Sequence, residues 1–404
     1  MRRARSTLLV GASTLVLAAC SSAGGAGAPT WVPSPALGAG NGPGPQASPV
    51  IPQPSAPNGP NGSPAPGSST APGTGTPKID PNVVATDLSF PVGLTMLPDG
   101  TALVGERTTG RIVRVQPRAG QPVPTVRTLR GLDSSGDGGL LDLALSPTFS
   151  EDGLVYAYIT TRSDNRVVDF TLKGPVTPVF TGIPKGRTGN TGRITFGTDH
   201  DLYIGTGDAG RPSQATDAHS LAGKVLRVDD IGDPAKGNPV ASSPVLTSGH
   251  RQVNGLCVVP RTPAVLEVEA GAPGRPDDVN QLVPGSSYGW PSSAGVARPA
   301  IGVLPAAFGA PGGCAVLSGR IWTTSLNGRA LLAAPLRSVT SVLSVGKFTA
   351  FLMNKYGRLK TVVAAADGAL WLTTSNRDGH GKPVAADERV IRYLPSGTSS
   401  GSPV

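Results

Sequence analysis

The residues best suited to chemistry in this 404-residue chain are a few acids, histidines and cysteines beside short apolar segments. Asp277 and Asp278 are adjacent acids that precede one such segment. Hard cations bind clustered carboxylate oxygens, so this pair could ligate calcium. Paired acids are also common as plain solvated turns, and the sequence leaves both interpretations open.

A second candidate is the carboxylate of Asp208, which follows the apolar stretch Leu202-Tyr203-Ile204 and the turn Gly205-Thr206-Gly207. The glycines let the backbone turn and leave this one acid at the strand end. Histidine is the usual proton acceptor near neutral pH, and the chain has four. For each we expect a solvated or hydrogen-bonded structural role rather than catalysis: His200, His219, His250 and His380.

The N-terminus reads as a targeting segment. Arg2, Arg3 and Arg5 precede an apolar run that is too short to span a bilayer as a mature helix. The following Leu17-Ala18-Ala19-Cys20 resembles a bacterial lipobox. That resemblance implies a signal peptide over 1–19 and lipidation of Cys20, which would anchor the chain at the extracytoplasmic face of the cell membrane. An ordinary secretory signal with a stray cysteine is the alternative.

Residues 20–82 are rich in Pro, Gly, Ser and Ala and carry almost no charge. Such a segment cannot bury enough apolar surface to offset chain entropy, so we expect a disordered tether, with a disordered tail over 396–404. The formal charge is +9, of which three positives are signal arginines. The basic residues of the remaining chain are scattered without runs, which argues against nucleic acid as a partner. We expect a monomer.

Two cysteines remain beyond the lipobox, Cys257 and Cys314. An exported compartment is oxidising, so an even pair favours a disulfide. Two buried free thiols are the alternative, because the sequence does not give their separation.

Short apolar segments separated by turns repeat along residues 83–395. Each unit is an apolar strand, a turn that often carries Asp-Gly, a second strand, a loop and a strand of the form apolar-x-Arg, as in Asp99-Gly100 and Asp367-Gly368. Six such units with a period of about 50 residues predict an all-β, six-bladed β-propeller of four-stranded blades. A β-sandwich array or two barrels is the alternative. Residues 83–89 are expected to add a strand to the last blade and close the ring.

The repeat resembles the soluble glucose/sorbosone dehydrogenases that depend on pyrroloquinoline quinone (PQQ). The resemblance covers most of residues 85–395 and rests on several motifs in order: Leu97-Pro98-Asp99-Gly100 with Glu106-Arg107, Gly138-Gly139-Leu140-Leu141, Gly192-Arg193-Ile194, Gly205-Thr206-Gly207-Asp208, Gly249-His250-Arg251, Asp277-Asp278-Val279-Asn280, Tyr288-Gly289-Trp290-Pro291 and Gly357-Arg358-Leu359-Lys360. In its lipoprotein design the chain resembles mycobacterial surface proteins with such a domain. The family's fold is a six-bladed propeller, and its cofactors are PQQ and calcium.

The resemblance implies a histidine base that takes the sugar's hydroxyl proton, an acid that orients it, and basic residues on the quinone's carboxylates. The base position is Gly189, which cannot accept a proton, whereas Asp208 matches the orienting acid. The cofactor-binding positions correspond to Asp137, Arg251, Gln252, Asn327, Arg358 and Lys360. Asn327 stands where a lysine is expected, and Asp137 is an acid that would repel a quinone carboxylate.

The calcium-bearing loop of the family corresponds to Glu269-Ala270-Gly271-Ala272-Pro273, which has one extra residue and lacks the family's histidine. The implied metal positions are Gly271, Pro273, Asp277 and Asp278.

Three functions remain open at this level. The first is a membrane-anchored PQQ-dependent sugar dehydrogenase whose quinone site is degraded. The second is a catalytically inactive propeller that binds a glycan, a cell-envelope component or a protein partner. The third is a hydrolase on the same ring, such as a lactonase, although no carboxylate-rich metal cluster in the sequence requires it.

Overall fold

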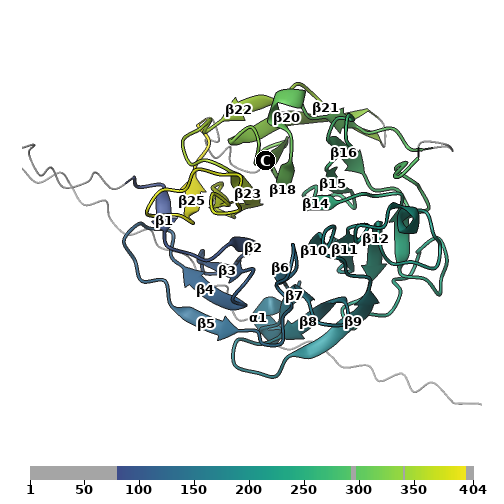
Figure 1. Cartoon of the computed structure of the whole chain (residues 1–404), viewed down its shortest axis with the longest axis horizontal. Helices are drawn as coiled ribbons and strands as arrows, with labels where there is room; N and C mark the ends of the chain where they lie inside the picture. Colours follow the sequence, from purple (N-terminus) through teal and green to yellow (C-terminus); the bar gives the residue numbers. More distant parts are fainter. Residues whose placement is uncertain (1–79, 293–296, 340–341, 397–404) are drawn as a thin grey trace, which may run out of the picture. The chain divides into compact units, whose positions relative to one another are not determined.

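The computed structural model describes residues 80–292, 297–339 and 342–396, and these form six antiparallel sheets arranged in a ring. The predicted signal peptide, most of the predicted tether and the tail from 397 on lie outside the described residues. Figure 1 shows the six sheets around a central axis, with the chain passing from blade to blade in sequence order. The prediction of a six-bladed propeller is confirmed.

Four blades hold four consecutive strands each. Blade 1 is β2 (Pro91–Met96), β3 (Ala102–Glu106), β4 (Arg111–Val115) and β5 (Thr125–Thr128). Blade 2 is β6 (Leu140–Leu145), β7 (Val155–Thr160), β8 (Asn165–Phe170) and β9 (Thr177–Ile183). Blade 3 is β10 (Gly192–Phe196), β11 (Leu202–Thr206), β12 (Lys224–Val228) and β13 (Val245–Ser248). Blade 4 is β14 (Val253–Val258), β15 (Val265–Glu269), β16 (Asp278–Gln281) and β17 (Gly302–Val303).

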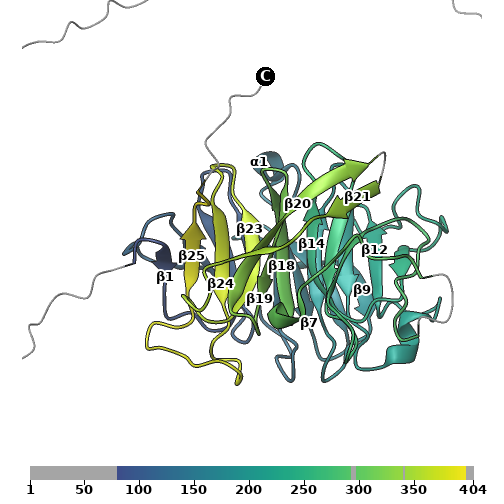
Figure 2. The same cartoon turned by 90° about the horizontal axis from the view of Figure 1, so that it is seen from above.

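The last two blades depart from this plan. Blade 5 is β18 (Pro311–Leu317), β19 (Arg320–Ser325), β20 (Ala330–Val339) and β21 (Val342–Val345), and β22 (Thr349–Phe351) also pairs with β20. In the side view the β20–β21 hairpin slants across the outside of the ring (Figure 2). Blade 6 is β23 (Leu359–Ala364), β24 (Leu370–Thr374) and β25 (Val390–Tyr393), completed by β1 (Val83–Ala85).

Strand β1 closes the ring as predicted. It pairs antiparallel with β25, so the first strand of the domain belongs to the last blade. Across the seam, the Thr361 hydroxyl donates to the Val92 carbonyl over 2.6 Å. Asp80 already belongs to this structure, because its carboxylate accepts a hydrogen bond from the Tyr356 hydroxyl at 2.9 Å. The described fold therefore begins three residues before β1.

The hydrophobic core is divided into layers between neighbouring blades. One layer packs Leu94 and Val104 of blade 1 against Trp371 of blade 6, and similar layers fill the other junctions. Each sheet thereby buries both of its faces, which a single small sheet cannot do alone. Cys257 of β14 and Cys314 of β18 form a disulfide between blades 4 and 5.

The few helices are short. They are α1 (Phe149–Asp152) and the 3₁₀ turns η1 (Pro212–Ala215) and η2 (Ala306–Phe308). No helix in the described ranges has the length and apolar character needed to cross a membrane.

Candidate active site

The innermost strands of the six blades stand around the central axis of the ring (Figure 1), and a cavity of about 620 Å³ lies where these strands begin. The first residues of β2, β10, β14, β18 and β23 reach this cavity, whereas later residues of the same strands line a second cavity of about 350 Å³. Because the inner strands start at the same end of the ring, side chains far apart in sequence converge there. All six blades contribute to its wall.

The larger cavity is rich in positive charge. Two carboxylates line it, Asp137 and Asp378, together with five basic side chains: Arg107, Arg193, Arg358, Lys360 and Arg377. Two of the basic groups are paired with acids, because Arg358 Nε lies 2.8 Å from Asp378 Oδ2 and Arg193 Nη1 lies 3.4 Å from Asp142 Oδ1. The remaining excess of cations favours an anionic occupant.

Lys360 is the clearest sign of such an occupant. The side chain is half-buried, and its ammonium has no hydrogen-bond or ion-pair partner within the described part of the chain. Burial and then the nearby Arg193 guanidinium lower the pKa of Lys360 to about 8. A cation held in this way gains a partner when an anion enters the cavity.

Arg193 forms the floor that separates the two cavities. Its Nε donates to the Asn254 carbonyl at 2.7 Å, and its Nη1 lies 3.4 Å from Asp142 Oδ1. The backbone N–H of Ile194 donates to the other oxygen of Asp142 at 3.1 Å. Burial nevertheless raises the pKa of Asp142 to about 6. The floor thus ties blades 2, 3 and 4 together at the axis.

Gly189 and Asp208 lie side by side at the edge of this region. A Cβ atom at Gly189 would stand 2.7 Å from Asp208 Oδ1, so the orienting acid is next to the expected base position. The Asp208 carboxylate instead accepts hydrogen bonds from the Gly210 N–H and from Trp290 Nε1, both at 2.9 Å. With φ of +71°, Gly189 has a left-handed backbone that a histidine rarely adopts.

Asp137 lines the cavity but also holds the loop that carries Gly189. Its Oδ2 accepts the Gly189 N–H at 2.7 Å, and its Oδ1 accepts the Asn190 side-chain amide. The acid that the resemblance placed against a quinone carboxylate therefore binds backbone and amide donors of this chain.

The other predicted cofactor positions separate into two groups. Gln252, Arg358 and Lys360 line the cavity. Asn327 does not line it, although its Oδ1 accepts a hydrogen bond from Arg358 Nη1 at 3.2 Å. Arg251 is also outside, with its guanidinium 5.5 Å from the Trp290 ring centre.

The predicted calcium positions do not form an oxygen cage among the described residues. The Gly271 carbonyl accepts a hydrogen bond from Arg251 Nη1 at 2.6 Å, which puts a cation on an oxygen expected to bind calcium. Asp277 uses one carboxylate oxygen on the Gly271 N–H at 2.9 Å, and Pro273 is exposed. The donor set does not fit calcium here, and we derive no chemistry from that ion.

No histidine is among the residues that line the cavity in the described structure. His250 is fully buried elsewhere, and His200, His219 and His380 are exposed. The sequence did not indicate Arg377 or Asp378, because no local pattern marks them. Arg107 stood in a family motif, but the motif did not place it in the cavity. Arg193 stood in a quoted motif, but its place on the ring axis had no sequence signal.

A profile described as glucose/sorbosone dehydrogenase matches residues 88–382 of the chain. The chain belongs to the glucose/sorbosone dehydrogenase family. Its relatives include the quinoprotein glucose dehydrogenase B of Acinetobacter calcoaceticus, 32% identical over 259 residues, or 54% of this chain and 53% of that protein. An aldose sugar dehydrogenase of Escherichia coli is 27% identical over 237 residues, or 53% and 62%. The chain spans little more than half the length of these curated relatives.

Solved structures of the same fold cover more of the chain. The PQQ-bound aldose sugar dehydrogenase of Streptomyces coelicolor is 38% identical, with a TM-score of 0.72 over 77% of this chain and 95% of that one. A Thermus protein described as a putative oxidoreductase (glucose dehydrogenase) is 36% identical, with a TM-score of 0.71 over 77% and 98%.

The backbone at Gly189 gives the first testable prediction. We expect Gly189→His to lower the free energy of unfolding by about 1–3 kcal/mol, because a non-glycine residue is strained in this conformation and its Cβ meets Asp208. Chemical denaturation of the wild type and the variant measures this, with Gly120→His as a control at a second positive-φ glycine with no neighbour within 4 Å of the added Cβ. A loss no larger than that of the control would show that Asp208 does not crowd position 189.

Proposed function

We propose that this chain is a PQQ-dependent sugar dehydrogenase that binds its quinone in the basic cavity but lacks a positioned base. The observation that carries the proposal is the unpartnered Lys360 ammonium among four arginines in a cavity of about 620 Å³. PQQ is a planar polycarboxylate, and Arg and Lys donors in a half-buried site suit such an anion. Family membership and the PQQ-bound relative support the same assignment.

The residues suited to hold the quinone are those that already face the cavity with donors. Lys360 and Arg358 would bind carboxylates, and the Gln252 side-chain amide adds a neutral donor. Arg193 at the floor contributes positive charge from below. When bound, PQQ would accept the hydride, and with it the two electrons, from the carbon that bears the reacting sugar hydroxyl.

The missing group is the proton acceptor for the sugar hydroxyl. Gly189 has no side chain, and the two cavity carboxylates are already engaged, Asp137 by backbone and amide donors and Asp378 by Arg358. Water is then left to take the proton. Since a positioned base contributes a factor of about 10²–10⁴, we expect turnover at least about a hundredfold below that of a histidine-bearing family member.

The decisive experiment is titration of the purified chain with PQQ, followed by sugar-dependent reduction of a dye with a panel of aldoses. We expect stoichiometric PQQ binding and slow turnover that depends on both PQQ and sugar. Binding with no sugar oxidation at all would favour the inactive binding propeller, and failure to bind PQQ would refute the proposal. Rapid turnover would show that another group replaces the base.

The charge of Lys360 predicts a pH dependence of PQQ affinity. Because the pKa of Lys360 is lowered to about 8, the ammonium is present below that pH and is lost as the pH rises through it. PQQ affinity should therefore fall roughly tenfold between about pH 7 and pH 10, the size of one charge-assisted contact.

The matched variants are Lys360→Met and, as a control, Lys173→Met, which changes an exposed lysine outside the cavity. Equilibrium dialysis should show weaker and flatter binding for Lys360→Met and an unchanged profile for the control. If the affinity of the wild type for PQQ stays constant across this pH range, the Lys360 ammonium does not bind the quinone.

We also propose that Cys20 is lipidated and holds the domain at the extracytoplasmic face of the cell membrane through the 20–82 tether. The support is the order of basic, apolar and lipobox segments at the N-terminus. Cys20→Ala should move the protein from the membrane fraction to the soluble fraction and abolish labelling by an alkyne fatty acid. Unchanged membrane association and labelling would contradict a lipid on this residue.

A further inference from the structure

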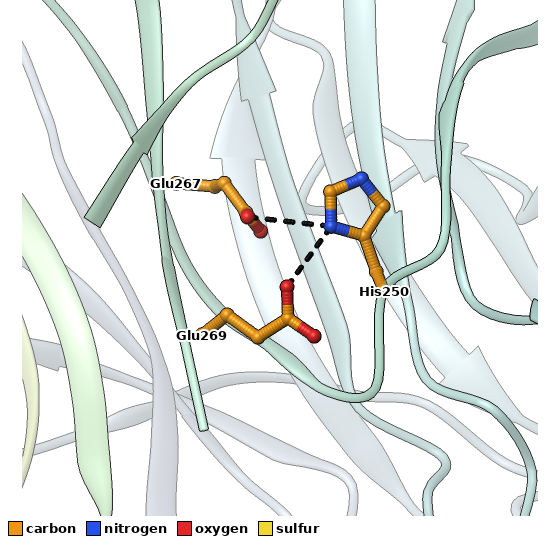
Figure 3. Close-up of side chains that lie close together, drawn as sticks. All are labelled: His250, Glu267 and Glu269. Atoms are coloured by element: carbon orange, nitrogen blue, oxygen red, sulfur yellow. Dashed lines mark hydrogen bonds and ion pairs between the residues drawn. The ribbon is translucent and has the colours of Figure 1, made fainter. Parts of the chain in front are cut away.

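A compact group of metal-ligating side chains lies behind the wall of the cavity, in blade 4. His250 precedes β14, and Glu267 and Glu269 lie on β15. Figure 3 shows the imidazole facing both carboxylates, with Nδ1 3.1 Å from Glu269 Oε2 and 3.3 Å from Glu267 Oε1. The three ligand atoms lie within 4.8 Å of one another.

The spacing matches that of ligands around a small cation. With metal–ligand bonds of about 2.0–2.2 Å in tetrahedral geometry, adjacent ligand atoms stand about 3.3–3.6 Å apart. The two measured Nδ1–oxygen distances are close to this range, so a metal ion could enter with small side-chain adjustments.

Burial makes the charge of this group costly. His250 and Glu267 have no exposed surface, and Glu269 is 7% exposed. Two carboxylates face one imidazole, and the Arg251 guanidinium next in sequence binds the Gly271 carbonyl instead. The group of Arg251 that does contact Glu269 is its backbone N–H, which donates to Oε1. With both carboxylates ionised, even a protonated imidazole would leave one negative charge without a compensating cation among these groups.

Two buried acceptors beside the imidazole are unpartnered. Glu267 Oε2 and Asn280 Oδ1 have no hydrogen-bond partner in the described structure. Both belong to this group, because Asn280 Nδ2 donates to Glu267 Oε1 at 2.7 Å. Orphaned oxygens in a dry site are unfavourable unless a cation or a further donor meets them.

The far side of the imidazole is arranged as for a metal ligand. His250 Nε2 lies 2.9 Å from Thr247 Oγ1, and Tyr288 stacks on the ring with centroids 4.8 Å apart. Metal-bound histidines usually donate their other N–H to such a partner, which fixes the tautomer and directs the free lone pair at the metal. If Nε2–H donates to Thr247, the Nδ1 lone pair points at two carboxylate oxygens, which is repulsive without a cation between them.

We propose that His250 Nδ1, Glu267 and Glu269 bind one divalent first-row transition metal. The side-chain oxygen Oδ1 of Asn280 would be a further ligand. An imidazole with two carboxylates suits zinc and its neighbours, whereas calcium and magnesium prefer oxygen-only sites. Bound there, the ion would join the 249–252 segment to β15. Gln252 and Ala270, which continue these two segments, line the cavity. The metal would thus brace the cavity wall, and this inference does not depend on the proposed enzymatic activity.

The test is to unfold and refold the full chain with Zn²⁺ or with EDTA, because the buried site is best loaded during folding. After gel filtration, elemental analysis should find about one zinc per chain in the first sample. The zinc-loaded protein should melt at least about 5 °C above the EDTA-treated protein. Refolding with Co²⁺ should give visible absorption bands of a nitrogen- and oxygen-ligated site.

Glu267→Gln should reduce the zinc content at least tenfold and remove the zinc-dependent rise in melting temperature. The matched control is Glu151→Gln, which changes an exposed acid of α1 that is not one of the three clustered ligands and should leave zinc content unchanged. If Glu267→Gln fails to fold, the metal content and the Co²⁺ spectrum of the wild type still show whether the chain binds a transition metal. Absence of stoichiometric zinc in refolded wild type, or binding of calcium in its place, would overturn the proposal and leave a protonated imidazole as the partner of the two acids.

Discussion

The structure depends on the closing of a ring whose inner strands all start at the same end. Arg193 sits on the axis of this ring and joins blades through the Asn254 carbonyl and the Asp142 carboxylate, while Thr361 and the Val92 carbonyl join the first and last blades. Arg193 lines both the larger cavity and the second one, so it lies between the two spaces. The starts of the inner strands and the loops beside them then supply the wall of the larger cavity.

Two requirements of sugar oxidation have separate physical origins in this cavity. Binding an anionic quinone needs positive charge, which the arginines and Lys360 provide from several blades. In the proposed function, removing a hydroxyl proton needs one acceptor at one point, and the resemblance assigns that point to Gly189, whose left-handed backbone is held by Asp137. The positive charge comes from several residues and tolerates many small changes. The proton acceptor is one side chain and is lost with a single substitution. Under the proposed function, this difference would account for a propeller that keeps the family's cavity without its base.

The blades could be predicted from the sequence because their signals are local. Alternating apolar residues and Asp-Gly turns such as Asp99-Gly100 define each hairpin. The closing strand was predicted within residues 83–89, and the structure places it at Val83–Ala85. The outer strand β9 (Thr177–Ile183) carries no such alternation, because most of its residues are exposed. The site was only partly predictable. Arg107 and Arg377 line the same cavity from the first and last blades, and the Arg251 contact with Gly271 depends on loop geometry that no sequence pattern gives.

The most direct measurement of the central claim is a crystal structure of the chain grown with PQQ. The account predicts the quinone in the basic cavity, its carboxylates on Lys360 and Arg358, and only water within hydrogen-bond reach of the sugar-binding face where a base would stand. An empty cavity, a quinone bound elsewhere, or a histidine moved into that face would contradict it.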